Sequence, residues 1–132
     1  MRALITGASS GIGKDIAKVL SQKGYELILV ARDEEKLENT KQELGGKNNI
    51  ELITMDLSKE ENCKTLAHNV KDIDLLVNNA GFGDCGSFEK TDLDKDIKMI
   101  ETNVIAYHIL TKLYLKEMIE KNSGKILNVA SI

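Results

Sequence analysis

Residues 3–13 read Ala-Leu-Ile-Thr-Gly-Ala-Ser-Ser-Gly-Ile-Gly, a short apolar run that leads directly into a glycine-rich stretch. The apolar run at 3–6 predicts a buried strand. From Ile12 onward apolar residues recur at helical spacing as far as Gly24, a residue type that commonly ends helices. The stretch therefore predicts a strand, a tight glycine turn and a helix in direct succession.

The three glycines of this turn have different physical roles in a phosphate-binding loop. Gly7 permits the sharp turn off the strand, Gly11 lets the backbone approach a pyrophosphate, and Gly13 lets helix and strand pack closely. The helix N-terminus offers N–H groups to the phosphates, and Ser9 and Ser10 add hydroxyl donors. An ordinary glycine-rich turn without a ligand is the alternative, but the position between strand and helix favours nucleotide binding.

The rest of the chain alternates short apolar runs with longer amphipathic stretches. The apolar runs predict further strands over 27–31, 50–55, 73–77 and 126–129. The amphipathic stretches predict helices capped by Asp33 and by Ser58, and a long helix over 92–120. Such alternation indicates right-handed βαβ units, a parallel sheet and a single α/β domain over residues 1–132.

Composition excludes several classes of function. The formal net charge of −3, with no basic stripe, argues against a nucleic-acid surface. No apolar run reaches the ~20 residues of a membrane span. Cys63 and Cys85 are too few for a disulfide scaffold, and the chain enters its first strand without a leader, so we expect a cytoplasmic protein. His68 and His108 have no ligand partners at metal-binding spacing, and we expect no metal.

Five motifs in order resemble those of the short-chain dehydrogenase/reductase family. The first is Thr-Gly-x-x-x-Gly-x-Gly at 6–13, whose spacing differs from the G-x-G-x-x-G of most dinucleotide folds. The others are Asp56 after the third strand, Asn-Asn-Ala-Gly at 78–81, Asn103 in the long helix and Ser131 after the fifth strand. The resemblance implies a Rossmann-type doubly wound parallel sheet of order 3-2-1-4-5, truncated after the fifth strand.

The resemblance also implies an oxidoreductase that binds NAD(P)(H) and acts on a small carbonyl or alcohol. The expected cofactor-binding residues are Thr6, Gly7, Ser9, Ser10, Gly11, Ile12, Gly13, Arg32, Asp56, Leu57, Asn79, Ala80 and Gly81. Asp56 would accept a hydrogen bond from the adenine amino group, form an Asx turn before a helix, or do both. Asn103, which taken alone is a structural helix residue, would bend its helix and hold a water in a proton relay. Ser131 would hydrogen-bond the substrate oxygen and stabilise the alkoxide formed during hydride transfer.

Arg32 bears on the choice of cofactor. It ends the second expected strand, about 20 residues after the glycine loop. In such folds the residue at this position contacts the 2′-hydroxyl or 2′-phosphate of the adenosine ribose. A carboxylate there favours NAD(H), whereas a guanidinium suits a 2′-phosphate, so we predict NADP(H). The neighbouring Asp33 leaves NAD(H) open. The alternative for Arg32 is a solvated strand end where it pairs with Asp33 or Glu34.

The family's chemistry requires a Tyr with a Lys four residues later, because a phenol with a pKa near ~10 is a poor base without a nearby cation. The residues four positions after Tyr25, Tyr107 and Tyr114 are Leu29, Thr111 and Met118. In the family this pair follows the Ser by roughly a dozen residues, and the 132-residue sequence ends one residue after Ser131. We therefore expect no turnover from these 132 residues alone. A nucleotide-binding module or inactive fragment is the alternative function.

The fifth expected strand, apolar over 126–130, would lie at the edge of such a sheet. Unpaired apolar edges invite pairing with another chain. We therefore expect a homo-oligomer, formed through this edge.

Overall fold

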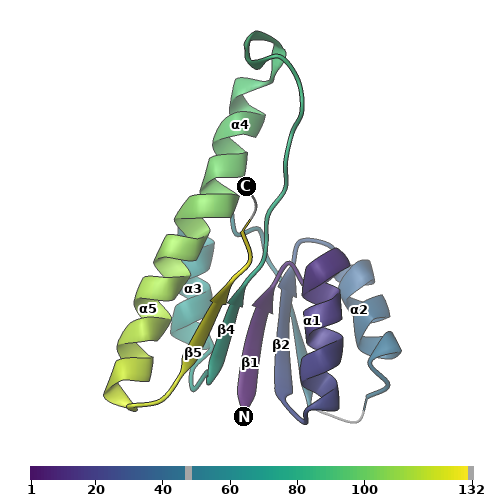
Figure 1. The fold of residues 1–132 in the computed structure, drawn as a ribbon, viewed down its shortest axis with the longest axis vertical. Coiled ribbons are helices and arrows are strands. Elements are labelled where there is room, and N and C mark those ends of the chain that lie inside the picture. Colours follow the sequence, from purple (N-terminus) through teal and green to yellow (C-terminus); the bar gives the residue numbers. More distant parts are fainter. Residues whose placement is uncertain (47–48, 131–132) are drawn as a thin grey trace.

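The computed structural model describes residues 1–46 and 49–130, and it contains a five-stranded, all-parallel sheet of order β3-β2-β1-β4-β5 (Figure 1). The strands are β1 (Arg2–Thr6), β2 (Glu26–Ala31), β3 (Ile50–Thr54), β4 (Leu75–Asn78) and β5 (Lys125–Asn128). The expected fold class and strand order are confirmed. The strand ends differ from the prediction by one or two residues, the usual uncertainty of a boundary.

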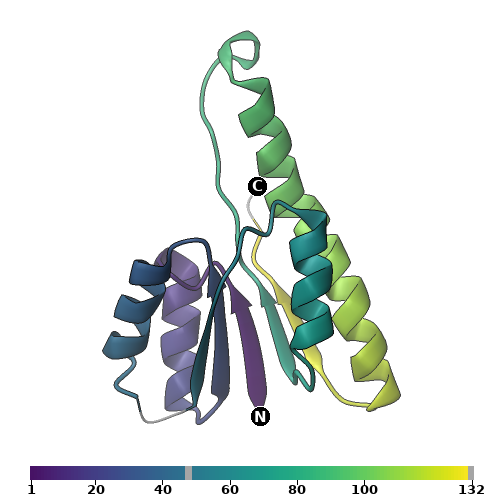
Figure 2. The same ribbon diagram turned by 180° about the vertical axis from the view of Figure 1, so that it is seen from behind.

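Helices cover both faces of this sheet. They are α1 (Gly11–Gln22), α2 (Glu34–Glu43), α3 (Glu60–Asn69), α4 (Leu93–Ile100) and α5 (Ala106–Glu120), with a 3₁₀ turn η1 (Phe88–Lys90) and a π-helical turn η2 (Glu101–Ile105). Helices α1 and α2 lie on one face, and α3 and α5 lie on the other (Figures 1 and 2). The molecule is therefore a three-layer α/β/α sandwich.

Alternate residues of the central strand β1 serve the two cores. Leu4 packs in the core under α3 and α5, while Ala3 and Ile5 pack in the core under α1 and α2, and all three are fully buried. Burial of both faces explains why β1 and β2 are continuous apolar runs in the sequence.

Two predicted helix caps have different outcomes. Asp33 caps α2 as expected, because its carboxylate accepts a hydrogen bond from the Lys36 N–H at 3.0 Å. The prediction that Ser58 caps a helix is wrong, since α3 begins at Glu60 and is preceded by Lys59. The N–H and hydroxyl of Ser58 both donate instead to Asp56 Oδ1, at 3.1 and 2.8 Å. The nearby carboxylate therefore forms an Asx turn that takes up both Ser58 donors.

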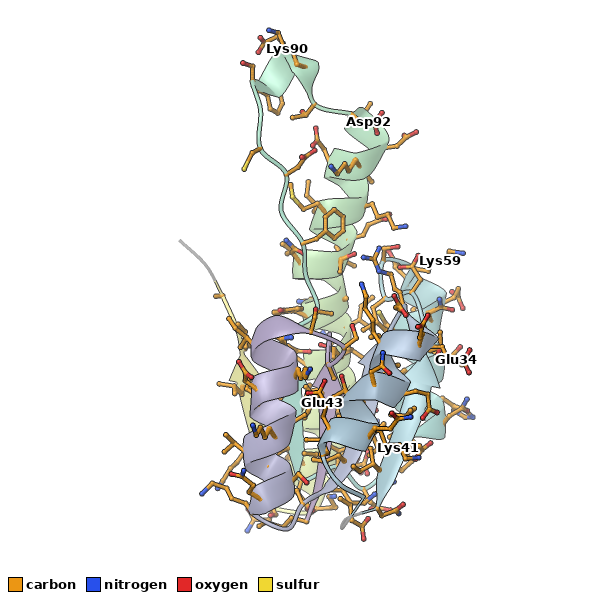
Figure 3. All side chains as sticks on the ribbon, turned by 90° about the vertical axis from the view of Figure 1, so that its right-hand side faces the viewer. Glu34, Lys41, Glu43, Lys59, Lys90 and Asp92 are labelled. Atoms are coloured by element: carbon orange, nitrogen blue, oxygen red, sulfur yellow. The ribbon has the colours of Figure 1, made fainter. Side chains whose placement is uncertain are left out.

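Residues 93–120 are helical throughout and match the predicted long helix. The π-helical turn η2 separates α4 from α5 within this stretch. Residues 82–100, which we call the projecting arm, extend past the carboxyl ends of the strands (Figures 1 and 2). Figure 3 shows Lys90 and Asp92 at the tip of this arm, far from Lys41 and Glu43 on α2. Within the described residues, no helix combines the length and the apolar character needed to cross a membrane.

Candidate functional site

A cleft of about 1370 Å³ lies at the carboxyl ends of the strands. It is at the point where the chain switches direction in the sheet, between β1 and β4, which is where open α/β sheets bind ligands. The predicted site residues that line it are Gly7, Ser9, Ser10, Ile12, Arg32, Asp56, Leu57, Asn79, Ala80, Gly81 and Asn103. Thr6, Gly11 and Gly13 do not line it, and Ser131 lies outside the described residues.

The glycine loop has the tight geometry that its sequence predicts. Gly7 adopts φ +66°, a left-handed conformation that favours glycine. A Cβ on Gly13 would collide with the Gly7 carbonyl oxygen and with the Asn79 side-chain nitrogen. Gly13 therefore permits the close packing of α1 against the strand ends, and the structure brings the loop and Asn79 together.

Thr6 supports the cleft from beneath. Its buried hydroxyl donates to the Val77 carbonyl at 3.3 Å and accepts from the N–H groups of Asn79 and Ala80, at 2.9 and 3.0 Å. The Asn79 amide donates in return to the carbonyls of Thr6 and Gly7, at 3.1 and 3.2 Å. These bonds fix the segment after β4 against the glycine loop.

The N-terminus of α1 is open to an anion. Its N-cap, Ser10, makes no side-chain capping bond, and the first turn of α1 contains no acidic residue. The first-turn N–H groups and the positive end of the helix dipole therefore face the cleft without a carboxylate. Ser9 and Ser10 add hydroxyls to the cleft wall.

Arg32 is exposed on the cleft wall at the end of β2. Asp33 forms an ion pair with Lys36, whose Nζ lies 3.5 Å from the carboxylate. The hydrogen bond from the Lys36 backbone N–H lowers the pKa of Asp33. Among the residues that the structure describes, no carboxylate lies within ion-pair distance of Arg32. The alternative pairing with Asp33 or Glu34 is therefore not what the structure shows.

Lys36 also lines the cleft and was not among the predicted residues. Its position three residues after Asp33, within the first turn of an amphipathic helix, is the signal that could have indicated it. It adds a second cation beside Arg32, partly neutralised by Asp33.

Asp56 is ionised at the end of β3. Burial alone would raise its pKa, but the two hydrogen bonds from Ser58 and the charge of Lys98 outweigh that effect and lower it. Lys98 Nζ, on the projecting arm, lies 3.4 Å from Asp56 Oδ2. The carboxylate is therefore an acceptor at neutral pH, as the expected contact with an adenine amino group requires.

Asn103 lies in the π-helical turn η2, and π turns within helices are frequent at functional sites. Its Oδ1 accepts from the Phe82 N–H at 3.1 Å, and its Nδ2 donates to the Phe82 carbonyl at 2.8 Å. A Cβ on Gly81 would lie 2.9 Å from Asn103 Oδ1, so Gly81 permits this approach. The role of Asn103 in a proton relay stays a prediction.

The end of β5, from which the chain continues to Ser131, is held by two side chains. The Asn78 Nδ2 donates to Asn128 Oδ1 at 2.8 Å, and the Tyr107 hydroxyl donates to the Val129 carbonyl at 3.2 Å. Burial raises the pKa of Tyr107. Its hydroxyl is therefore a structural donor rather than a base at neutral pH.

These features are those of a Rossmann-type domain: a cleft at the switch point, a glycine loop opening a helix, and polar groups at the ends of β2, β3 and β4. The sequence profile of the short chain dehydrogenase family matches residues 1–132, and the chain belongs to that family.

Individual relatives agree with this assignment. The chain is 39% identical over 131 residues to the 3-oxoacyl-(acyl-carrier-protein) reductase FabG of Rickettsia prowazekii, covering 98% of this chain and 53% of that protein. A metagenomic short-chain oxidoreductase in complex with NADP superposes with a TM-score of 0.94 at 33% identity, covering 100% of this chain and 62% of that one. A short-chain dehydrogenase of Sphingobium yanoikuyae in complex with NADPH gives 0.92 at 29% identity, covering 99% and 53%. The chain thus spans about half the length of the curated relative.

Proposed function

We propose that this chain forms the nucleotide-binding part of an NADP(H)-dependent oxidoreductase that interconverts a small carbonyl compound and an alcohol. Arg32 carries the cofactor preference, because its guanidinium lies on the cleft wall without a carboxylate partner among the described residues. A free guanidinium is suited to a 2′-phosphate. The NADP and NADPH complexes of the similar structures support this choice.

The residues around the cleft fit such a cofactor along its length. Asp56 and Leu57 would hold the adenine, and Arg32, beside Lys36, would bind the 2′-phosphate. The open N-terminus of α1 would bind the pyrophosphate together with Ser9 and Ser10. When bound, the nicotinamide would donate or accept the hydride. Ser131 would then hydrogen-bond the substrate oxygen, and Asn103 would hold a water for proton transfer, as the family resemblance implies.

Calorimetric titration of the 132-residue chain with NADP⁺ and NAD⁺ tests the cofactor preference. We expect NADP⁺ to bind at least about tenfold more tightly, because a hydrogen-bonded charge pair contributes about 1.5–3 kcal/mol. Arg32→Gln should abolish the preference. Lys18→Gln, which removes an exposed cation of α1 outside the cleft, should retain it. Equal affinities for the two nucleotides in the unsubstituted chain would contradict the assignment.

The same cleft supports a second function, nucleotide binding without turnover. None of the three tyrosines in this sequence has a Lys four residues later, and Tyr107 is committed to the Val129 carbonyl. We therefore expect residues 1–132 to oxidise NADPH no faster than background with a panel of aldehydes and ketones. Turnover above background, measured by NADPH absorbance, would show that this chain supplies its own acid or base.

A further inference from the structure

Arg32 contacts the aromatic ring of Phe82 across the cleft. The guanidinium carbon lies 5.8 Å from the ring centroid. The two residues come from elements that are not neighbours, since Arg32 follows β2, Phe82 follows β4, and β1 lies between those strands. A cation over a ring face is attracted by the ring quadrupole within about 6 Å. The contact therefore gives Arg32 a partner that leaves its hydrogen-bond donors available.

Phe82 is itself held in place. Its backbone N–H and carbonyl both bond to the Asn103 side chain, at 3.1 and 2.8 Å, so its backbone is fixed against η2. The Phe82 residue is half-buried on the cleft wall. A chain of contacts thus runs from η2 through Phe82 to the guanidinium.

We propose that Phe82 is a positioning residue, which holds the Arg32 guanidinium where a 2′-phosphate binds and so strengthens the preference for NADP(H) over NAD(H). This inference rests on the proposed function. Arg32 is a long, flexible side chain that loses rotamer freedom when it binds a phosphate. A ring that already restricts the guanidinium reduces that entropic cost. Lys36 also lines the cleft, but its ammonium lies 3.5 Å from the Asp33 carboxylate, and the cation over the Phe82 ring is Arg32.

The test uses adenosine 2′,5′-bisphosphate and 5′-AMP, which differ only in the 2′-phosphate, titrated calorimetrically into the 132-residue chain. We expect Phe82→Leu to reduce the affinity ratio of bisphosphate to 5′-AMP by about two- to fivefold, the size of an exposed cation–π contact. The affinity of the Phe82→Leu variant for 5′-AMP should equal that of the unsubstituted chain. Phe82→Tyr keeps the ring face and should restore the ratio of the unsubstituted chain.

A double-mutant cycle separates positioning from a general effect on the cleft. In the Arg32→Gln background, Phe82→Leu should leave the ratio unchanged, because the cation that the ring orients is gone. Equal weakening of both nucleotides by Phe82→Leu would overturn the inference, since the ring would then act on adenosine or on the fold.

The outcomes also distinguish this inference from the proposed function. If the unsubstituted chain shows no preference for the bisphosphate, both fail together. If the chain prefers the bisphosphate and Arg32→Gln abolishes that preference, while Phe82→Leu retains it in full, only the role of Phe82 is overturned.

Discussion

The side chains of Thr6 and Asn79 each bond to the other's backbone. The Thr6 hydroxyl accepts from the Asn79 N–H at 2.9 Å, and the Asn79 Nδ2 donates to the Thr6 carbonyl at 3.1 Å. Thr6 is the last residue of β1 and Asn79 directly follows the adjacent strand β4, but the two lie 73 positions apart in the sequence. The pair therefore joins the first and second halves of the sheet at the floor of the cleft.

Replacing Thr6 with Val should destabilise the chain. Val keeps the shape but removes the hydroxyl, and it leaves the N–H groups of Asn79 and Ala80 without that acceptor in a largely buried site. We expect a loss of about 2–4 kcal/mol in the free energy of unfolding, measured by urea denaturation. Thr6→Ser retains the hydroxyl and should recover most of the loss. Equal stability of the Val and Ser variants would show that these hydrogen bonds contribute nothing net.

Gly13→Ala should be destabilising for a steric reason. The added Cβ would collide with the Gly7 carbonyl and the Asn79 side chain. These two groups are hydrogen-bonded to each other, so neither can move away without losing that bond. Overpacking of this kind costs about 1–3 kcal/mol. Gly86→Ala is the matched control, because a Cβ there meets only the Thr91 methyl at 3.6 Å. A Gly13→Ala chain that unfolds at the same urea concentration as the control would refute the packing role of Gly13.

Much of this architecture could be predicted because it follows from local pattern. Alternating apolar runs and amphipathic helices predicted the parallel sheet, and the glycine spacing predicted the loop. For the long helix, the resemblance predicted only that Asn103 bends it, and the π form of η2 was not predicted. The bonds from Asn103 to Phe82 join residues 21 positions apart, which local pattern does not reveal. The contacts of Lys98 with Asp56 and of Phe82 with Arg32 escaped prediction for the same reason. The prediction that Ser58 caps a helix was wrong because the N–H and the hydroxyl of Ser58 both donate to the Asp56 carboxylate.

The two cysteines should differ in reactivity. Cys85 is exposed, whereas Cys63 is fully buried, its thiol donates to the Leu57 carbonyl, and burial raises its pKa to about 11. Because the thiolate is the reactive form, a disulfide reagent near neutral pH should modify Cys85 rapidly and Cys63 only after unfolding. Cys85→Ser should remove the fast phase. Rapid modification of both thiols in the native chain would show that α3 opens readily.

The raised pKa of Cys63 also predicts a dependence of stability on pH. The folded state binds the thiol proton more tightly than the unfolded state, whose pKa is near 9.0. This contribution to stability is therefore fully present below pH 9 and is lost as the pH rises towards 11. Replacing Cys63 with Ala should flatten that part of the curve of unfolding free energy against pH. Parallel curves for the two chains would contradict the assignment.

The edge strand β5 carries the last prediction, that copies of this chain associate through it. The strand pairs with β4 on one side only within the described residues, and Leu127 is 44% exposed. An unpaired apolar edge can add a strand from a second copy, so we propose that the 132-residue chain forms dimers or larger species as its concentration rises. Leu127→Lys places a charge on this strand and should shift the chain towards monomer, whereas Leu115→Lys, at an equally exposed position on α5, should have a smaller effect. Light scattering over a concentration series measures both, and a clean monomer at the highest concentration would contradict pairing through β5.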